Sequence, residues 1–146
     1  MSQIISAPVV HPARRVPSAR TATLVVAAAA VATLAAWLVA GRFTTLDVRL
    51  RPGGSATHVG AVMVIAATIL VGFAAWAVRA LLARLVPRHA RTAWLVLAIA
   101  ALVLSLSAPF GAGTTFATKA SLACLHLLAA AILIPAFAGG RAARSS

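Results

Sequence analysis

Acidic residues are almost absent from this chain, since Asp47 is the only carboxylate side chain among 146 residues. A mechanism that needs two carboxylates for acid and base steps is therefore excluded, and so is a calcium site built from several acids. Asp47 lies in a polar connection and not in an apolar run. Small proton-coupled multidrug exporters need a carboxylate within the membrane, so that class is excluded as well.

Cysteine is equally scarce, with Cys124 as the only one. A single thiol forms no intrachain disulfide and no dithiol pair for thiol oxidation. Cys124 lies in the middle of an apolar run, where we expect it to act as a small packing residue.

Charged residues are missing from four long apolar runs, which cover residues 21–40, 59–78, 92–108 and 120–138. A hydrocarbon core of about 30 Å needs about 20 apolar residues in a helix, and each run comes close to that length. Backbone amides in lipid must be paired within their own segment, and the alternation typical of a membrane barrel does not occur in these runs. The sequence predicts an all-α, polytopic membrane protein, an antiparallel bundle of four transmembrane helices joined by short connections.

The 13 basic residues give a net charge of +12, but they flank the spans and do not form a stripe on a soluble fold. We therefore expect no nucleic-acid partner. Basic residues beside spans are retained on the cytoplasmic side, which favours an orientation with both termini inside. This orientation divides them nine to four between inside (Arg14, Arg15, Arg20, Arg79, Arg84, Arg88, Arg91, Arg141, Arg144) and outside (Arg42, Arg49, Arg51, Lys119). The interpretation is a multi-pass protein of a bacterial cytoplasmic (inner) membrane, with anionic lipid head groups as partners at its cytoplasmic face.

Three segments divide the chain. Residues 1–20 hold three prolines and three arginines without apolar periodicity, which indicates a disordered basic cytoplasmic tail. Residues 21–138 form the transmembrane domain, and residues 139–146 form a second cytoplasmic tail. The first span is too long for a cleaved signal peptide, whose apolar region has about 7 to 15 residues, so we expect it to be retained. Tryptophans near the span ends, Trp37, Trp76 and Trp94, are typical of interfacial anchors.

The first outer connection, residues 41–57, has a pattern of its own. Leu46, Val48 and Leu50 alternate with Asp47, Arg49 and Arg51, and a Pro-Gly-Gly turn follows. This predicts a short extended element over the mouth of the bundle. An ordinary connector is favoured over a binding lid. Within this outer-loop charge cluster, we expect Asp47 to pair with Arg49, Arg51 or another cation of the loop.

The inner connection after the second span continues as an amphipathic helix until Pro87, and Arg79 and Arg84 are placed where they can reach lipid phosphate. Before the fourth span, Thr114 and Thr115 suit a helix cap. Small residues permit close helix contacts in lipid. We expect such contacts at Thr68 and Gly72 and along a ladder in the first span, with dimerisation as the alternative (Ala28, Ala32, Ala36, Ala40).

The fourth span holds the most unusual polar residue, His126, about 10 Å below the outer end of its helix. Ionisable groups at such depth are functional candidates. Lys119 lies on the same face at the rim, and His58 begins the second span, so the three define a candidate polar pocket open to the outside. The favoured alternative is a neutral His126 that bonds a neighbouring helix, for example at Ser105 or Ser107. Neither a metal site nor a haem is predicted, and no cofactor is expected.

Several stretches carry a resemblance to a known group: Leu104–Pro109, then Lys119 and Leu125–Pro135, together with Gly72–Trp76 in the second span. Over roughly residues 22–138 the chain resembles the small four-span membrane proteins of high-GC bacteria grouped as a domain of unknown function. The resemblance implies the four-span architecture. It implies no activity, because none is established for the group, and it transfers no catalytic residues.

Two functions follow from these patterns. The leading hypothesis is a non-enzymatic integral membrane protein that acts through lipid or membrane-protein contacts, with a homo-oligomer as one arrangement. The alternative is a small transporter or channel subunit for an anionic or neutral solute, with an outward-facing pocket lined by Lys119 and His126. An enzyme ranks third, because the chain lacks the acids, thiol pairs or metal clusters that reactions commonly use.

Overall fold

The structure, a computed structural model, describes residues 16–49, 54–112 and 115–139. Four helices in this part of the chain are long and apolar enough to cross a membrane. They are α1 (Ala19–Ala40), α2 (Ala61–Leu85), α3 (Ala90–Ala112) and α4 (Phe116–Phe137). The protein is therefore mostly helical, and its helices are those expected of a multi-pass membrane protein.

The helix bounds follow local signals at their ends. Ser18 caps α1 by accepting from the Thr21 amide at 3.3 Å, and Thr115 caps α4 by accepting from the Thr118 amide at 3.1 Å. α1 thus begins at Ala19, inside the segment predicted as a tail, while residues 1–15 and 140–146 of the two tails lie outside the described residues. α2 extends to Leu85, and Pro87 lies in the turn that follows.

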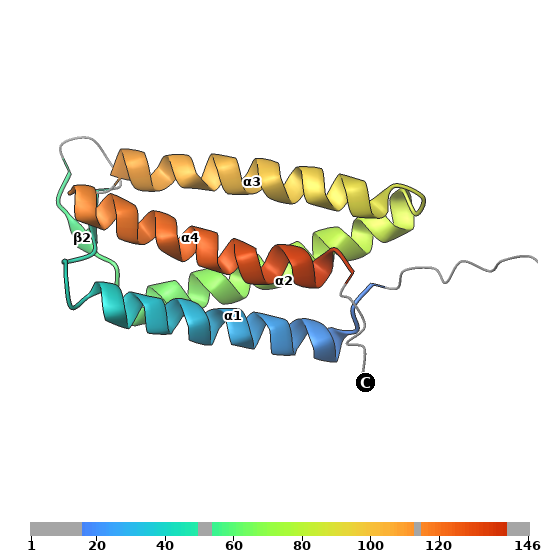
Figure 1. Ribbon diagram of the computed structural model, residues 1–146, viewed down its shortest axis with the longest axis horizontal. Coiled ribbons are helices and arrows are strands. Elements are labelled where there is room, and N and C mark those ends of the chain that lie inside the picture. The colour runs from blue at the N-terminus through green and yellow to red at the C-terminus, as the bar shows by residue number, and fades with distance from the viewer. Residues whose placement is uncertain (1–15, 50–53, 113–114, 140–146) are drawn as a thin grey trace, which may run out of the picture.

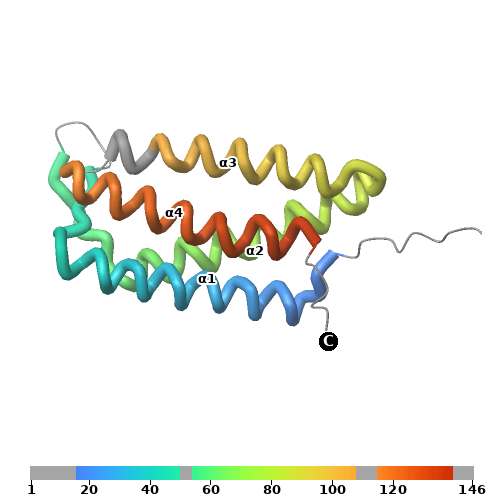
Figure 2. Tube along the Cα trace, in the orientation of Figure 1, coloured from blue at the N-terminus to red at the C-terminus, as the bar shows by residue number. Residues whose placement is uncertain are grey.

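The helices lie side by side, and the chain reverses direction after each one (Figures 1 and 2). α1 packs against α2 and α4, and α3 packs against α2 and α4. Two ends can be named. The hairpin end holds the last turn of α1, the first turns of α2 and α4, and a small hairpin. The arginine end holds the first turn of α1, the last turn of α4 and the turn between α2 and α3.

The hairpin joins α1 to α2 and consists of β1 (Asp47–Val48) and β2 (Thr57–His58). The strands are antiparallel, with Asp47 opposite His58 and Val48 opposite Thr57. Leu46 and Val48 are buried while Arg49 is exposed, so the predicted alternation is confirmed over these residues. Leu50 and Arg51 of the predicted extended element, and Pro52 and Gly53 of the predicted turn, lie outside the described residues.

Two apolar clusters form the interior. The cluster at the arginine end takes its buried residues from α1, α3 and the end of α4 (Ala22, Val26, Ala29, Trp94, Leu133, Phe137, Ala138). Ala75, Trp76 and Leu82 of α2 pack against it, and the rings of Trp94 and Phe137 meet edge to face with centroids 6.1 Å apart. The cluster at the hairpin end joins the hairpin to α2 and α4 (Leu46, Val48, Val59, Val64, Leu122, Leu125). Many large apolar side chains point outward instead, as the surface of a protein immersed in lipid requires.

Small residues bring α1 and α2 together. Thr68 and Gly72 are buried against α1, as expected for an internal contact. The alanine ladder is partly wrong, because Ala28 is exposed and the buried face of α1 runs through Val26, Ala29 and Thr33. The predicted face and the buried face of α1 differ by a rotation of the helix about its axis by a fraction of a turn. The sequence does not reveal this rotation, because α1 is apolar on every side.

Candidate functional site

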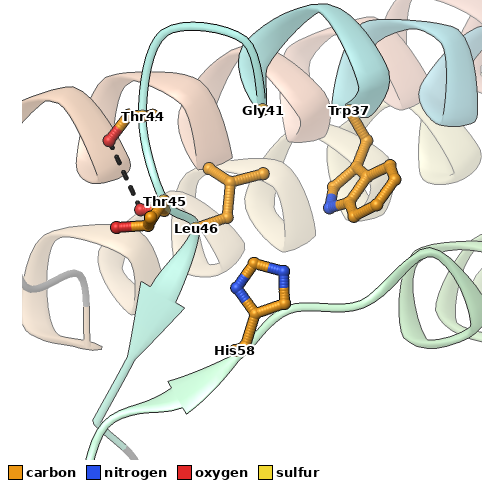
Figure 3. A pocket seen from close by; sticks show the side chains of 6 residues that line it. All are labelled: Trp37, Gly41, Thr44, Thr45, Leu46 and His58. Carbon is orange, nitrogen blue, oxygen red and sulfur yellow. Dashed lines mark hydrogen bonds between the residues drawn. The ribbon is translucent and has the colours of Figure 1, made fainter.

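A cavity of about 170 Å³ opens at the hairpin end, between the last turn of α1 and the hairpin. Figure 3 shows the six residues that line it: Trp37, Gly41, Thr44, Thr45, Leu46 and His58. Its lining combines an aromatic ring, two hydroxyl groups and an imidazole. Apolar walls with a few placed polar groups are typical of small-molecule sites.

Trp37 is held in place by a bond to the backbone beyond the hairpin. Its indole N–H donates to the Val59 carbonyl at 2.8 Å. The Val59 amide in turn donates to the Leu46 carbonyl at 2.7 Å. These bonds link α1 to Leu46, which precedes β1, and to Val59, which follows β2. The Trp37 ring, the aromatic wall of the cavity, is therefore held in place without a ligand.

His58 pairs with Asp47 across the hairpin, with Nδ1 3.2 Å from Oδ1. Because a carboxylate accepts hydrogen bonds, this pair places a hydrogen on Nδ1, and in the neutral form of the ring the lone pair then lies on Nε2. Figure 3 shows the ring pointing toward Leu46 and Trp37, with a nitrogen facing that space. A histidine of the same connection is thus one partner of Asp47, and this contact directs the other ring nitrogen toward the cavity. The pairing of Asp47 with Arg49, Arg51 or another cation of the loop stays a prediction.

Backbone groups shape the remaining wall. The Thr45 carbonyl accepts from the Thr44 hydroxyl at 3.3 Å and from the Thr118 hydroxyl of α4 at 3.0 Å. The Gly41 amide donates to the Trp37 carbonyl at 2.9 Å and closes the last turn of α1. The cavity therefore lies at the C-terminal end of a helix, where the helix dipole is negative.

The predicted polar pocket is divided in the structure. His58 lines the cavity, whereas Lys119 and His126 are not among its lining residues. Both are half-buried on α4. His126 Nδ1 lies 2.7 Å from the Leu122 carbonyl one turn earlier, and a carbonyl accepts, so the ring donates within its own helix. Ser105 and Ser107 also bond carbonyls of their own helix, at Leu102 and Leu104.

The outer-loop charge cluster is described in part. Asp47 is half-buried and Arg49 is exposed, while Arg51 lies outside the described residues. The sequence predicted a short extended element over the mouth of the bundle, but it did not predict Trp37, Thr44 and Thr45 as cavity residues. Their position was the available signal. Trp37 lies near the end of the first span, and Thr44 and Thr45 directly precede the predicted extended element.

Arginines gather at the opposite end, the arginine end. Arg20, Arg84, Arg88 and Arg91 are exposed there. Arg79 differs, because only 2% of its surface is exposed and its Nε–H donates to the Phe137 carbonyl at 2.9 Å. Its Nη1 has no hydrogen-bond partner among the described residues. The expectation that Arg79 reaches lipid phosphate is therefore wrong; it turns inward and binds the last turn of α4.

The tryptophans lie near helix ends as expected but point inward. Trp76 donates to the Pro17 carbonyl at 3.1 Å, and Trp94 donates to the Ile134 carbonyl at 3.2 Å. Together with Trp37, each indole ties a helix to a different segment of backbone. Their role in this structure is to join helices at both ends of the protein.

Comparison with known proteins gives one family. A family model described as a family of unknown function (DUF6069) matches residues 13–143. Comparisons with curated proteins and with solved structures give no significant match. The matched residues include all four helices and the cavity, and they confirm the resemblance to a domain of unknown function. The chain belongs to the DUF6069 family, a family of unknown function.

Proposed function

We propose that this protein is a non-enzymatic integral protein of a bacterial cytoplasmic membrane that binds anionic lipid head groups at its arginine end. The proposal includes an antiparallel bundle of four transmembrane helices with both termini in the cytoplasm. The observation that carries it is the gathering of four exposed arginines at one end of four apolar helices (Arg20, Arg84, Arg88, Arg91). Basic residues next to spans attract anionic lipids, each contributing about 1 kcal/mol near the surface.

The distribution of charge supports this orientation. The hairpin end holds Asp47, the only acid of the chain, together with Arg42, Arg49 and Lys119 among the described cations. Counted over the whole sequence, the arginine end and the two tails carry nine of the 13 basic residues. An end with this excess is retained in the cytoplasm, where anionic lipids are also found.

A role through contacts, in place of catalysis, is supported by how the polar side chains within the helices are used. His126 bonds a carbonyl of its own helix, and the hydroxyl groups of Thr33 and Thr68 lie within hydrogen-bond distance of each other and of carbonyls of their own helices. Such bonds satisfy polar groups in lipid without a substrate. The outward apolar side chains of α3, including Val96, Val103 and Leu104, suit contact with lipid or with another membrane protein.

Lipid retention tests the proposal. Native mass spectrometry of the full chain, with phosphatidylglycerol and phosphatidylcholine offered in equal amounts, counts lipids and subunits in one measurement. We expect phosphatidylglycerol to be retained preferentially, and Arg84→Gln with Arg91→Gln to weaken retention at least tenfold. The matched control is Arg42→Gln with Arg49→Gln at the hairpin end. Equal losses from both pairs, or no preference for the anionic lipid, would refute the proposal.

The transporter alternative has one observation in its favour, the half-buried position of Lys119 and His126 on one face of α4. It requires that His126 serve a solute in addition to its bond with Leu122. A proteoliposome flux that disappears in His126→Ala, while the helix content and thermal midpoint stay unchanged, would establish this alternative and contradict the leading proposal. With the leading proposal correct, His126→Ala leaves lipid retention unchanged.

A further inference from the structure

We propose that the cavity at the hairpin end binds an uncharged sugar ring, with Trp37 as its stacking wall and His58 as its hydrogen-bond acceptor. The site lies at the opposite end of the helices from the exposed arginines. It goes beyond lipid binding at the arginine end and does not depend on it. The shape, polarity, charge and size of the cavity favour this ligand.

Trp37 supplies an aromatic wall that does not need to be ordered on binding. Its indole N–H is already bonded to Val59, and Leu46 beside it is almost fully buried. A ring held in this way loses little side-chain entropy when a ligand packs against it. The flat C–H face of a sugar is a suitable partner, because it offers apolar hydrogens to the electron-rich face of the indole.

The polar groups of the cavity mainly accept hydrogen bonds. Nε2 of His58 presents a lone pair, because Nδ1 faces Asp47. Thr44 and Thr45 add hydroxyl oxygens, although the Thr44 hydrogen is already donated to the Thr45 carbonyl. A ligand that complements this lining must offer several hydrogen-bond donors, as the hydroxyl groups of a sugar do.

Charge selects a neutral ligand. None of the six lining residues is lysine, arginine, aspartate or glutamate, and the C-terminal end of α1 is unfavourable for an anion. Arg42 lies within the lining segment and Arg49 lies after it, and these two exposed side chains are unfavourable for a cation. An uncharged polyhydroxyl ring avoids both penalties.

The size of the cavity fits one ring. A volume of about 170 Å³ is smaller than the roughly 300 to 1,000 Å³ of pockets that take drug-sized ligands, so a single ring is the largest ligand expected to fit. Phe43 follows Gly41 in the segment that lines the cavity, Phe116 begins α4, and both rings are exposed at the hairpin end of the spans. A sugar bound there can be free in solution or be the head group of a glycolipid in the same leaflet.

The experiment uses the full chain in nanodiscs of phosphatidylcholine and phosphatidylglycerol. Maltoside and glucoside detergents are avoided, because their head groups are the proposed ligand. Saturation-transfer NMR with methyl β-glucopyranoside measures binding of the free sugar, and native mass spectrometry measures retention of monoglucosyl-diacylglycerol. We expect saturable binding in at least one arm, and the arm with the tighter binding identifies the source. Glucuronate and glucosamine, the charged analogues, are expected to bind at least fivefold more weakly than the methyl glucoside.

The variants locate the site. His58→Phe keeps an aromatic ring and removes both ring nitrogens, including the acceptor that faces the cavity, so we expect binding to weaken about five- to tenfold. Thr45→Val retains the side-chain shape and is expected to weaken binding by about two- to fivefold. The matched control is His89→Phe, which makes the same change at an exposed histidine of the other end and leaves binding unchanged. No binding in either arm, equal effects of the two histidine variants, or tighter binding of a charged analogue would overturn the proposal.

Discussion

The hydroxyl oxygens of Thr33 and Thr68 lie 3.1 Å apart in the buried contact between α1 and α2. Thr33 also lies 2.9 Å from the Ala29 carbonyl, and Thr68 lies 2.8 Å from the Val64 carbonyl. Each hydroxyl has a single hydrogen, so one threonine donates across the interface while the other donates to its own helix. The pair fixes the register of two helices that are otherwise apolar on every side.

Removing one hydroxyl leaves the other without its partner across the interface. We expect Thr33→Val and Thr68→Val each to lower the free energy of unfolding by about 0.5 to 1.5 kcal/mol, in line with hydrogen bonds between membrane helices. The double variant is expected to cost less than the sum of the two, with a coupling of about 0.6 kcal/mol. Unfolding in mixed micelles with increasing dodecyl sulfate measures all three. Additive effects would show that the two hydroxyls do not interact.

The same interface depends on a close approach at Gly72. A Cβ added there would lie 2.7 Å from Cγ2 of Val26 and 3.0 Å from its Cγ1. Valine is branched at Cβ and has one strongly preferred rotamer in a helix, so it does not turn aside. We expect Gly72→Ala to destabilise the protein by about 1 to 3 kcal/mol, as overpacking does.

The rescue by Val26→Ala distinguishes a clash from a general effect of the substitution. In the double variant the added methyl group occupies space that the Val26 side chain has left. We therefore expect Gly72→Ala to destabilise the Val26→Ala protein much less than it destabilises the unaltered protein. Gly60→Ala serves as the control, because a Cβ there meets no atom within 4 Å. An undiminished penalty in the double variant would place the cause elsewhere than in the contact with Val26.

Arg79 joins two helices at the arginine end. Its guanidinium donates to the Phe137 carbonyl, one of the last carbonyls of α4, which no later helical turn can satisfy. We expect Arg79→Met, which keeps the apolar stem, to lower stability by about 1 to 3 kcal/mol through the unpaired carbonyl. Arg84→Met, an exposed site on the same helix, should change stability by less than about 0.5 kcal/mol. A more stable Arg79→Met would show that burying the guanidinium costs more than its bond returns.

The sequence was sufficient for the features that depend on composition along the chain. Runs without charge predicted the four helices, and the alternation around Asp47 predicted an extended segment over their mouth. It was insufficient wherever the rotation of a helix decides the outcome. Arg79 lies near the end of a span, where arginine commonly reaches lipid phosphate. It lies on the side of α2 that faces α4, however, so its side chain points inward.

The candidate site was likewise predicted only in part from the sequence. His58 was predicted as a polar pocket residue, and it lines the cavity. Its relation to Trp37 and Asp47 depends on the hairpin register, which pairs residues 47 and 58 across a connection that local patterns do not determine. Lys119 and His126 share a helical face, as their spacing predicts, but the cavity forms beside α1 and not beside that face.

Orientation in the membrane is open to a direct measurement with two single-cysteine variants. Both carry Cys124→Ala, which removes the only native thiol. Ser55→Cys lies in the exposed hairpin connection, and His89→Cys lies in the exposed turn between α2 and α3. With both termini in the cytoplasm, a membrane-impermeant maleimide added to intact cells should label the first variant and should label the second only after permeabilisation. The physical reason is the excess of arginine at the α2–α3 end, which opposes its transfer across the membrane. The reverse labelling pattern would invert the proposed topology and place the arginine end, with its lipid contacts, in the outer leaflet.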